Sequence, residues 1–508
     1  MRPYKILLVF ISIFILLFFI SLIFPENGIK INEKLWLQFP SFHEIISKNE
    51  IEYKDISHII SASSVAINDT LETTVEIMDE KLMGNSLPTT EIKMDSVSAP
   101  SFDIIRVKAD SLKSLIFKMQ FPDNDKNILY PFFDNLKDLR NNPKLIRILH
   151  YGDSQIEGDR ITSFIRNKLQ ENFGGMGIGL FPAVLLNKHS ISLKHSTSDN
   201  WKKYTIKDVY ESTINHRHLG ILISFSRFSA HPDELNKNNK IYESWINLKK
   251  SDISYPLARR YNQCRILYSY NTKPLIVELH QDNVILDAEI LIPNKSLNIL
   301  QWTFNTFPDE ITIKFKGEDS PDVYAIALDD TVGIAMDNIP LRGSQGLEFT
   351  RTDMSLLQEM YNRLNVKLLL LQFGVNVVPN IVDDYIYYEN QFYHQLKSLK
   401  EIQPDLTIIV MGVSDMSTKN KGIYESYPNI EKIRDAQKRA AFKAGCAFWD
   451  TYEAMGGNNS MPSWVFAKPS LAQKDFIHYS YRGAKVIAEM FYNSLITEYN
   501  EYLKKSWN

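Results

Sequence analysis

Two parts of the chain alternate short apolar segments with segments of helical periodicity, and this alternation restricts the fold more than any other feature. Residues 145–151, 366–373, 406–411 and 447–449 have the length of buried strands. Helical spacing occurs in residues 161–173, 354–364, 392–402, 430–444 and 483–495. Strands that are apolar throughout and separated by helices are typical of a parallel sheet covered on both faces. We therefore predict an α/β fold with a parallel central sheet.

A different pattern separates these two parts. Short β-branched segments lie between turn signals such as Pro293-Asn294-Lys295, and few helical stretches occur among them. The predicted strands are residues 219–225, 265–270, 274–280, 284–292 and 311–315. This pattern favours a β-sandwich or jelly-roll over residues 186–335. It would be inserted between two catalytic segments, residues 128–185 and 336–508.

The N-terminal segment is almost continuously apolar from Ile6 to Phe24, interrupted only by Ser12 and Ser21. A helix of this length just crosses a hydrocarbon core of roughly 30 Å. Because Arg2 and Lys5 precede it, we expect a cytoplasmic N-terminus and a catalytic head in the periplasm or outside the cell. We interpret residues 1–26 as a membrane anchor with a single transmembrane helix. A cleaved signal peptide is the alternative.

Residues 27–127 are interpreted as a stalk or linker, partly disordered. Residues 61–100 within it are rich in Ser, Thr, Asp, Glu and Asn and contain no aromatic side chain. A segment of this composition cannot bury much apolar surface. Such a linker would hold a catalytic head away from a bilayer.

Charge and cysteine content exclude several classes of protein. The formal net charge is −3, without the basic excess typical of a nucleic-acid binder. Cys264 and Cys446 are too few for a disulfide framework or a cysteine metal site. We interpret both as buried small side chains, although a single disulfide stays possible. The sequence implies no cofactor and no metal, since the histidines, His216 and His218 included, show no ligand set.

Ser154 is the candidate nucleophile. Gly152-Asp153-Ser154 directly follows the apolar segment 145–151 and precedes a predicted helix. A serine in this position stands at the carboxyl edge of a parallel sheet, where open α/β folds bind their ligands. Three residues alone are weak evidence, because a turn with a capping serine looks the same.

Asp475 and His478 supply the partners that a nucleophilic serine needs. A hydroxyl becomes a good nucleophile when a base removes its proton, and histidine suits that role at neutral pH. A carboxylate then orients the imidazole and stabilises its cation. The three-residue offset lets one short loop carry both groups.

Acyl transfer also needs donors for an oxyanion, and two segments offer them. Gly343 ends the segment Asn338-Ile339-Pro340-Leu341-Arg342-Gly343, and its backbone N–H can approach a substrate. Asn376 follows the strongest apolar segment in Phe373-Gly374-Val375-Asn376, and its side-chain amide can donate.

These four segments together resemble the SGNH-hydrolase superfamily, also called GDSL esterases. The resemblance covers roughly residues 128–185 and 336–508 and implies a three-layer fold around the parallel sheet. It implies that Ser154 is the nucleophile, His478 the general base and Asp475 the group that orients His478. The oxyanion hole would be the Ser154 N–H, the Gly343 N–H and the Asn376 side chain.

Two features depart from the usual pattern of that superfamily. Val377 follows Asn376 where an aspartate is common, which removes a customary supporting carboxylate. The second motif lies far down the chain because of the predicted insert. We assign it to Gly343 rather than to Gly174, Gly175, Gly177 or Gly179, which we expect to form a loop that lines the cleft.

The combination of these motifs with an inserted β domain also resembles bacterial envelope peptidoglycan and polysaccharide O-acetylesterases. The insert of those enzymes is similar to a carbohydrate-binding module. Its aromatic residues would then stack on sugars or belong to a sandwich core; the candidates are Trp201, Tyr204, Trp245 and Tyr268. Asp415 follows the segment 406–411 and would contact substrate or cap a loop.

The sequence leaves three functions open. The first is a serine esterase that removes acetyl or other short acyl groups from an envelope or extracellular glycan through an acyl-enzyme on Ser154. The second is an O-acyltransferase that places acetyl on a polysaccharide with a membrane-embedded acyl-donor partner. The third is a non-enzymatic glycan-binding protein. The expected partner in each case is a glycan, acylated where it is the substrate of an esterase, and not a nucleic acid.

Overall fold

The computed structural model describes residues 3–24, 29–32, 35–37, 53–62, 117–185, 190–231, 240–420 and 422–505. The chain divides into two compact units, residues 1–53 and 54–508. The first unit contains helix α1 (Pro3–Ile23) and a hairpin of β1 (Ile29–Asn32) and β2 (Leu35–Leu37).

The N-terminal predictions are only partly tested. Among the described residues, no helix has the length and apolar character needed to cross a membrane. The membrane anchor predicted for residues 1–26 is therefore not confirmed. Most of the linker predicted for residues 27–127 lies outside the described residues. Helix α3 (Ser57–Ala62) within it contributes buried Ile59 to the core of the second unit.

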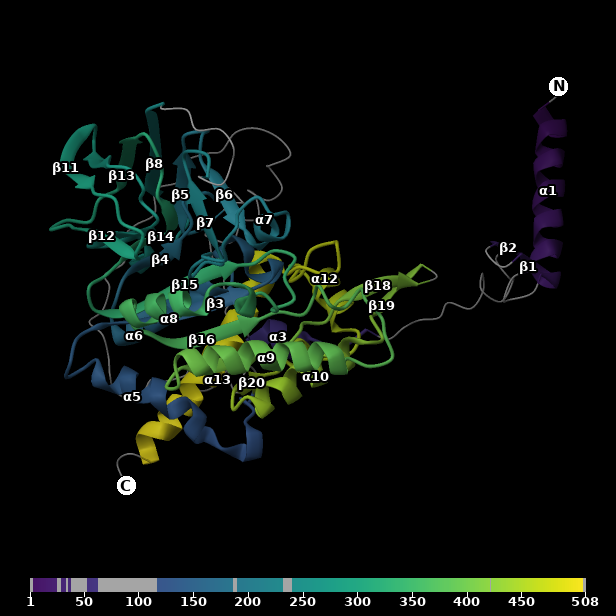
Figure 1. The fold of residues 1–508 in the computed structure, drawn as a ribbon. Coiled ribbons are helices and arrows are strands. Elements are labelled where there is room, and N and C mark those ends of the chain that lie inside the picture. The colour runs from purple at the N-terminus through teal and green to yellow at the C-terminus, as the bar shows by residue number, and fades with distance from the viewer. Residues whose placement is uncertain are drawn as a thin grey trace. The chain divides into compact units, whose positions relative to one another are not determined.

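A parallel five-stranded sheet forms the centre of the second unit (Figure 1). Its order is β15-β3-β16-β17-β20, and every neighbouring pair is parallel. The strands are β3 (Leu145–Gly152), β15 (Gly333–Pro340), β16 (Val366–Gln372), β17 (Thr407–Met411) and β20 (Ala447–Trp449). The predicted α/β architecture with a parallel central sheet is confirmed.

Helices cover both faces of this sheet, because alternate strand residues point to opposite sides. Ile148 of β3 packs with α5 (Tyr130–Asp138), α6 (Thr162–Phe173) and α13 (Tyr481–Lys505). Its neighbour Leu149 packs on the other side with α8 (Met354–Arg363), α9 (Ile386–Ile402) and α10 (Ile430–Lys443). Both residues are fully buried. Two apolar cores thus enclose the sheet and give three layers.

An all-antiparallel β domain lies between β3 and β15 in the chain. Its first sheet has the order β11-β10-β13-β8-β5 and its second the order β12-β9-β14-β7-β6, with β4 paired to β14. A shared apolar core joins the two sheets as a sandwich. The strands are β4 (Gly177–Phe181), β5 (Leu193–Thr197), β6 (Lys202–Thr205), β7 (Ser224–Arg227), β8 (Tyr242–Lys250), β9 (Gln263–Ser269), β10 (Leu275–Gln281), β11 (Val284–Leu291), β12 (Asn298–Thr303), β13 (Glu310–Gly317) and β14 (Asp322–Asp329).

A buried ion-pair network joins this domain to the central sheet. Arg147 of β3 pairs with Asp329 of β14 and with Asp337 of β15, each at 2.5 Å. The backbone N–H of Leu180 in β4 donates to Asp337 Oδ1 at 2.7 Å. Because such charges are costly to bury unless paired, they favour this one arrangement of the strands. Strand β4 itself pairs with β14 and so belongs to the sandwich sheet, although it precedes the boundary predicted at residue 186.

One predicted strand differs from the structure. Residues 219–225 were expected to be extended, but β7 begins only at Ser224. Gly220 and Ile223 have positive φ values of 68° and 51°, which a strand does not tolerate. The apolar side chains of this segment are nevertheless buried, so they pack as a turn.

Two further interpretations of side chains are resolved. Cys264 and Cys446 are both buried and both free, which rules out the single disulfide.

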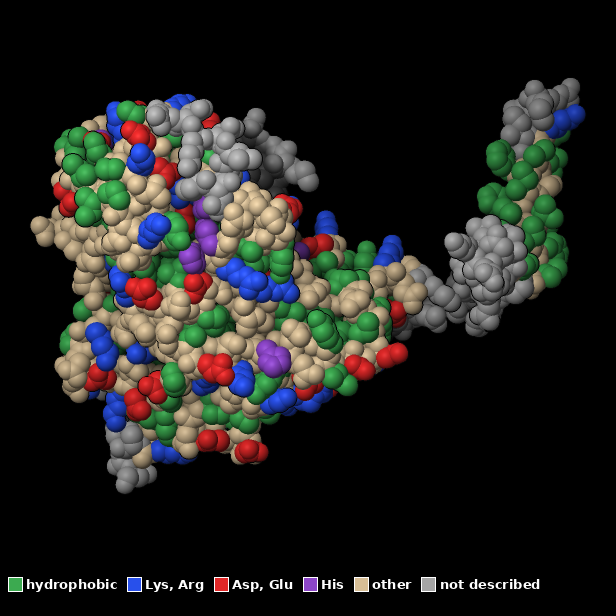
Figure 2. Space-filling view, viewed as in Figure 1, with side chains coloured by type: hydrophobic (Ala, Val, Ile, Leu, Met, Phe, Trp, Pro, Cys, Tyr) green, Lys and Arg blue, Asp and Glu red, His purple; other side chains and the backbone are tan. Residues whose placement is uncertain are grey.

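Trp201, Tyr204 and Tyr268 are buried in the β domain, whereas Trp245 is 39% exposed. Exposed apolar side chains also gather over β11 (Figure 2); they are Val284, Ile285, Leu286 and Ile290.

The remaining elements are short. They are helices α7 (Ile206–Tyr210), α11 (Thr451–Met455) and α12 (Ser460–Phe466), strands β18 (Ser417–Asn420) and β19 (Ile423–Ser426), and 3-10 helices η3 (Pro122–Asn124), η4 (Lys126–Leu129), η5 (Ser154–Asp159), η6 (Leu257–Arg259) and η7 (Phe349–Arg351).

Candidate active site

Ser154 lies at the carboxyl end of β3, where η5 begins. The turn before it is tight: a Cβ on Gly152 would stand 2.9 Å from the carbonyl oxygen of Gln372. Only glycine fits there without a shift of backbone. Ser154 itself is partly exposed. Its hydroxyl therefore reaches the sheet edge at which α/β folds bind ligands.

Ser154, His478 and Asp475 form one continuous hydrogen-bonded series. His478 Nε2 lies 2.8 Å from Ser154 Oγ, and His478 Nδ1 lies 2.7 Å from Asp475 Oδ2. The other carboxylate oxygen, Oδ1, accepts the backbone N–H of Ile477 at 2.9 Å and of His478 at 3.0 Å. The structure thus brings together the three residues that the sequence singled out.

The Asp475 carboxylate is held in its charged form. Partial burial alone would raise its pKa, but the hydrogen bonds from the His478 side chain and from two backbone N–H groups lower the pKa below its usual value. A charged carboxylate beside Nδ1 favours the proton on that nitrogen. Nε2 is then free to accept a proton from Ser154.

Phe476 fixes the loop that carries both partners. Its φ is 60°, a left-handed conformation that costs a non-glycine residue of order 1–3 kcal/mol. Its ring is stacked on Tyr424 with the centroids 3.5 Å apart. Its carbonyl oxygen accepts the N–H of Ser417 at 3.0 Å. These contacts hold a strained backbone that turns Asp475 and His478 toward the same side.

Gln155 is a site residue that the sequence analysis missed. Its side-chain Nε2 donates to the Ile477 carbonyl at 2.7 Å, and its Oε1 accepts the Tyr479 N–H at 3.3 Å. Gln155, the residue after Ser154, therefore forms hydrogen bonds with the backbone on both sides of His478. The signal in the sequence was only its position, because a buried glutamine has no motif of its own.

Asp153 links the Ser154 turn to the Asn376 segment. Its carboxylate accepts backbone N–H groups of Gln155, Gly374 and Val375. Burial raises the pKa of Asp153 to about 6 against these hydrogen bonds. The aspartate of the Gly-Asp-Ser motif thus orders the segment that carries Asn376.

Gly343 and Asn376 lie on loops that are tied to each other. Asn376 Nδ2 donates to the Ser344 carbonyl at 2.9 Å, and Gln345 Nε2 donates to the Asn376 carbonyl at 3.2 Å. Leu341 N–H in turn donates to the Gly152 carbonyl at 2.7 Å. Gly343 has a φ of 78°, with nothing within 4 Å of the place where a Cβ would stand. Both expected oxyanion donors therefore lie on segments joined to the Ser154 turn.

The other glycines have a packing role. A Cβ on Gly175 would stand 2.5 Å from Ile334, and a Cβ on Gly177 would stand 2.1 Å from the Leu328 carbonyl. Gly179 would likewise meet the Asp337 side chain. These residues let α6 and β4 approach β14 and β15 closely. This packing role accounts for Gly175, Gly177 and Gly179 in place of the expected cleft lining, and the assignment of the second motif to Gly343 stays a prediction.

Asp415 caps loops and does not face the cleft. It is fully buried. Its oxygens accept the N–H groups of Met416 at 2.9 Å and Met461 at 2.7 Å, and the hydroxyl of Ser426 at 2.6 Å. Of the two roles left open by the sequence, the structure favours loop capping.

Asp415→Ala is therefore expected to lower the free energy of unfolding by about 3 kcal/mol or more, since several buried donors lose their acceptor. Equilibrium denaturation in urea measures this loss. The KM for an ester substrate should stay within about twofold for the folded fraction, because Asp415 is buried away from solvent. A stable variant with a greatly raised KM would instead assign Asp415 to substrate binding.

Among the described residues, one group of side chains is close enough to hold a metal ion: His216, His231 and Asp322 of the β domain. The sequence analysis found no such set.

Comparison with known proteins gives the fold of the chain. No family model matches the chain, and no curated protein matches it. A solved structure described as a peptidoglycan O-acetylesterase in action covers 74% of this chain and 96% of its own, with a TM-score of 0.56 and 21% identity. The chain therefore has that fold.

Two other solved structures match far more weakly. A protein described as a GDSL-like lipase from Bacteroides ovatus has a TM-score of 0.24 and 10% identity, over 59% of this chain and 96% of its own. A family two carbohydrate esterase from Cellvibrio japonicus has a TM-score of 0.23 and 8% identity, over 60% of this chain and 99% of its own. Similarity at this level carries no argument about function.

Proposed function

We propose that this protein is a serine esterase that removes acetyl or other short acyl groups from an envelope or extracellular glycan. The observation that carries the proposal is the series Asp475–His478–Ser154, with links of 2.7 and 2.8 Å. In the proposed reaction His478 Nε2 takes the Ser154 proton as Oγ attacks the ester carbonyl. The glycan hydroxyl leaves with that proton, and an acyl-enzyme forms on Ser154.

Water completes the proposed cycle. His478 removes a proton from a water molecule that attacks the acyl-enzyme, and Ser154 regains its proton as the free acid leaves. The oxyanion of each step would be stabilised by the N–H groups of Ser154 and Gly343 and by the Asn376 amide.

Solvent access favours hydrolysis over transfer. The side chains of His478 and Asp475 are 25% and 39% exposed, and Ser154 is partly exposed. An acyltransferase must keep water from an acyl-enzyme until its acceptor binds. An open site of this kind suits an esterase better. The acyltransferase with a membrane-embedded acyl donor remains the alternative to be tested, and the intact series of three residues speaks against a purely glycan-binding role.

A pocket beside the Ser154 turn suggests how the β domain would contribute. Glu157 and Gly158 of η5 line one side, and Phe181 and Lys203 of the β domain line the other. We propose that part of the glycan lies between the two domains. Acetylated peptidoglycan is the first substrate to test, because a solved structure with this fold is described as a peptidoglycan O-acetylesterase.

The proposal is tested with the full chain and an aryl acetate as acyl donor. Acetate release is followed with and without a glycan acceptor, and the products are analysed by mass spectrometry. An esterase releases acetate at a rate that the acceptor does not change, and it also deacetylates O-acetylated peptidoglycan. Slow release without acceptor, together with acetylated glycan in its presence, would identify a transferase instead.

Asn376→Ala is expected to lower kcat by about 10²–10³-fold with little change in KM, because one oxyanion donor is lost. Steady-state kinetics on an aryl acetate measure this effect. Gln345→Ala is the matched control, since Gln345 joins the same two segments through its side chain. The control should lose less than about threefold, far below the oxyanion range. Equal losses in the two variants would mean that Asn376 is structural.

A further inference from the structure

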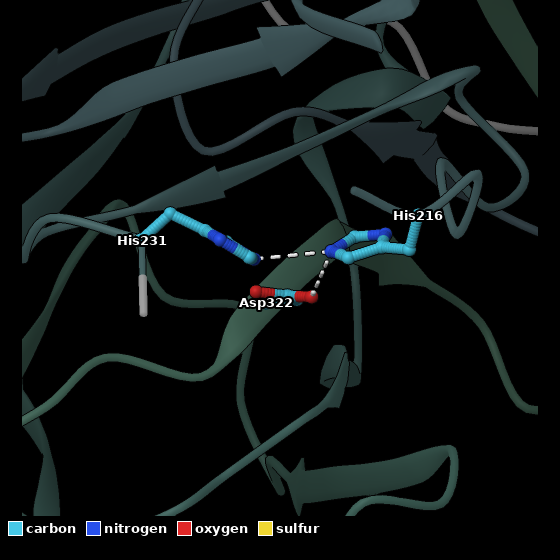
Figure 3. Close-up of side chains that lie close together, drawn as sticks. All are labelled: His216, His231 and Asp322. Carbon is cyan, nitrogen blue, oxygen red and sulfur yellow. Dashed lines mark hydrogen bonds and ion pairs between the residues drawn. The ribbon is translucent and has the colours of Figure 1, made fainter. Parts of the chain in front are cut away.

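Three side chains from separate segments converge in the β domain (Figure 3). His216 comes from the loop between α7 and β7, His231 follows β7, and Asp322 begins β14. The two Nε2 atoms of the histidines lie 3.0 Å apart. His216 Nε2 also lies 4.0 Å from Asp322 Oδ2. The three potential ligand atoms are all within 4.8 Å of one another.

The surrounding residues hold these side chains in place. Asp322 is fully buried, and its Oδ1 accepts a hydrogen bond from Arg227 Nη1 at 2.6 Å. This bond orients the carboxylate with Oδ2 toward His216. His231 is only 3% exposed. The ring of His216 is stacked on Phe225 and Tyr270. A second hydrogen bond on a carboxylate, like that from Arg227 to Asp322, is typical of metal ligands.

We propose that His216, His231 and Asp322 bind one divalent first-row transition metal ion, for which Zn²⁺ is the probe. Two imidazoles and a carboxylate form a common zinc ligand set. Zinc–ligand bonds of about 2.0–2.1 Å in a tetrahedral site place two ligand atoms roughly 3.3 Å apart. The 3.0 Å between the two Nε2 atoms is close to that value. Asp322 Oδ2, which lies 4.0 Å from His216 Nε2, must move roughly 0.7 Å closer to that atom to reach the same spacing.

A water molecule would be the fourth ligand of the tetrahedral zinc ion. The His216 side chain is 14% exposed, whereas the other two ligands are buried, so solvent reaches the site from the His216 side. Binding at Nε2 puts the proton of neutral His216 on Nδ1. The His218 backbone N–H, whose nitrogen now lies 3.2 Å from His216 Nδ1, would then face another N–H group. The distance between these two nitrogens must therefore increase. The loop from α7 to β7 therefore adjusts slightly when the metal binds.

The metal would stabilise the interface between the β domain and the catalytic domain. The loop that carries His216 contacts the catalytic part next to α8. Asp353 N–H donates to the Arg217 carbonyl at 2.8 Å, and His218 Nε2 lies 3.3 Å from Asp353. A metal that ties this loop to β14 would stabilise the β domain against the catalytic domain. Its role is structural, independent of the chemistry at Ser154.

The experiment uses the full chain, stripped with a chelator and titrated with ZnCl₂ by calorimetry. One equivalent should bind, and the melting temperature should rise. Co²⁺ in its place should give visible absorption bands of a nitrogen- and oxygen-ligated site. His231→Gln should weaken binding by more than about 100-fold, since loss of an outer contact alone costs 10–100-fold. It should also abolish the rise in melting temperature.

Two further variants make the result decisive. His218→Gln is the matched control: it lies next to His216 in space but pairs with Asp353, and it should bind Zn²⁺ like the wild type. His216→Gln repeats the ligand test at a less buried position, in case the His231 variant folds poorly. Absence of stoichiometric binding would overturn the proposal and leave a hydrogen-bonded histidine pair. Unchanged binding in both ligand variants would also overturn it, because the ion would then bind elsewhere.

Discussion

Ser154→Ala should lower kcat/KM for an aryl acetate by at least about 10⁴-fold, because no other group can form the acyl-enzyme. Ser154 Oγ is the atom that His478 Nε2 contacts at 2.8 Å. Some turnover above the uncatalysed rate should survive, since oxyanion donors and substrate binding act without the nucleophile. The free energy of unfolding should change little, because Ser154 is partly exposed and its truncation leaves no large cavity.

A covalent probe separates loss of the nucleophile from loss of the fold. A fluorophosphonate should add once to the wild type, at Ser154, and not at all to the variant. Intact-mass and peptide spectra locate the adduct, and denaturation curves compare the stabilities. Near-normal turnover by Ser154→Ala, or labelling of another serine in the wild type, would remove the proposed mechanism.

The central sheet was readable from the sequence because its strands are apolar throughout. Strand β20 was predicted with its observed limits, and β3 and β16 within one residue. Helix α13 was predicted to end at Leu495 but runs to Lys505. Its buried side continues through Tyr499 and Tyr502, whose hydroxyl groups make them weaker apolar signals. Strand β15 was missed because its first residues were assigned to the β insert.

The apolar pattern of residues 219–225 led to a wrong strand prediction, because these side chains are buried without forming a regular strand. Leu219, Ile221 and Leu222 are as buried as strand residues, yet Leu219 has no regular structure and the other two belong to a turn. An apolar run of this length identifies a buried segment and not its backbone conformation. Gly220 was the local signal that the run is not a strand.

The chemistry-bearing residues of the site were predictable, whereas the contacts that hold them were not. Ser154, Asp475 and His478 could be chosen because acyl transfer demands those residue types. Gln155 could not, because its role depends on which backbone groups of the His478 loop come within its reach. The proposed zinc site could not be predicted for the same reason: Asp322 lies near His216 and His231 because β14 pairs with β7.

Asp475→Asn is expected to lower kcat by about 10³–10⁴-fold, because an asparagine favours the wrong tautomer of the histidine. The carboxylate oxygen now 2.7 Å from His478 Nδ1 accepts the proton of that nitrogen. An amide NH₂ in the same place would donate to Nδ1 and move the proton to Nε2, the atom that must accept from Ser154. Asp475→Ala is the matched control, since water in the vacated space lets Nδ1 keep its proton. It should retain more activity than the asparagine variant.

The pH dependence of the unfolding free energy provides an independent test of the role of Asp475, because the direction of the change can be predicted. The pKa of Asp475 is lowered in the folded protein. Its carboxylate therefore stabilises the fold at neutral pH, and that contribution is lost as the pH falls through about 4 and below. Urea denaturation of the wild type and Asp475→Asn should show a difference in unfolding free energy that shrinks over this range. A pH-independent difference, or an alanine variant less active than the asparagine variant, would contradict the role given to Asp475 in orienting His478.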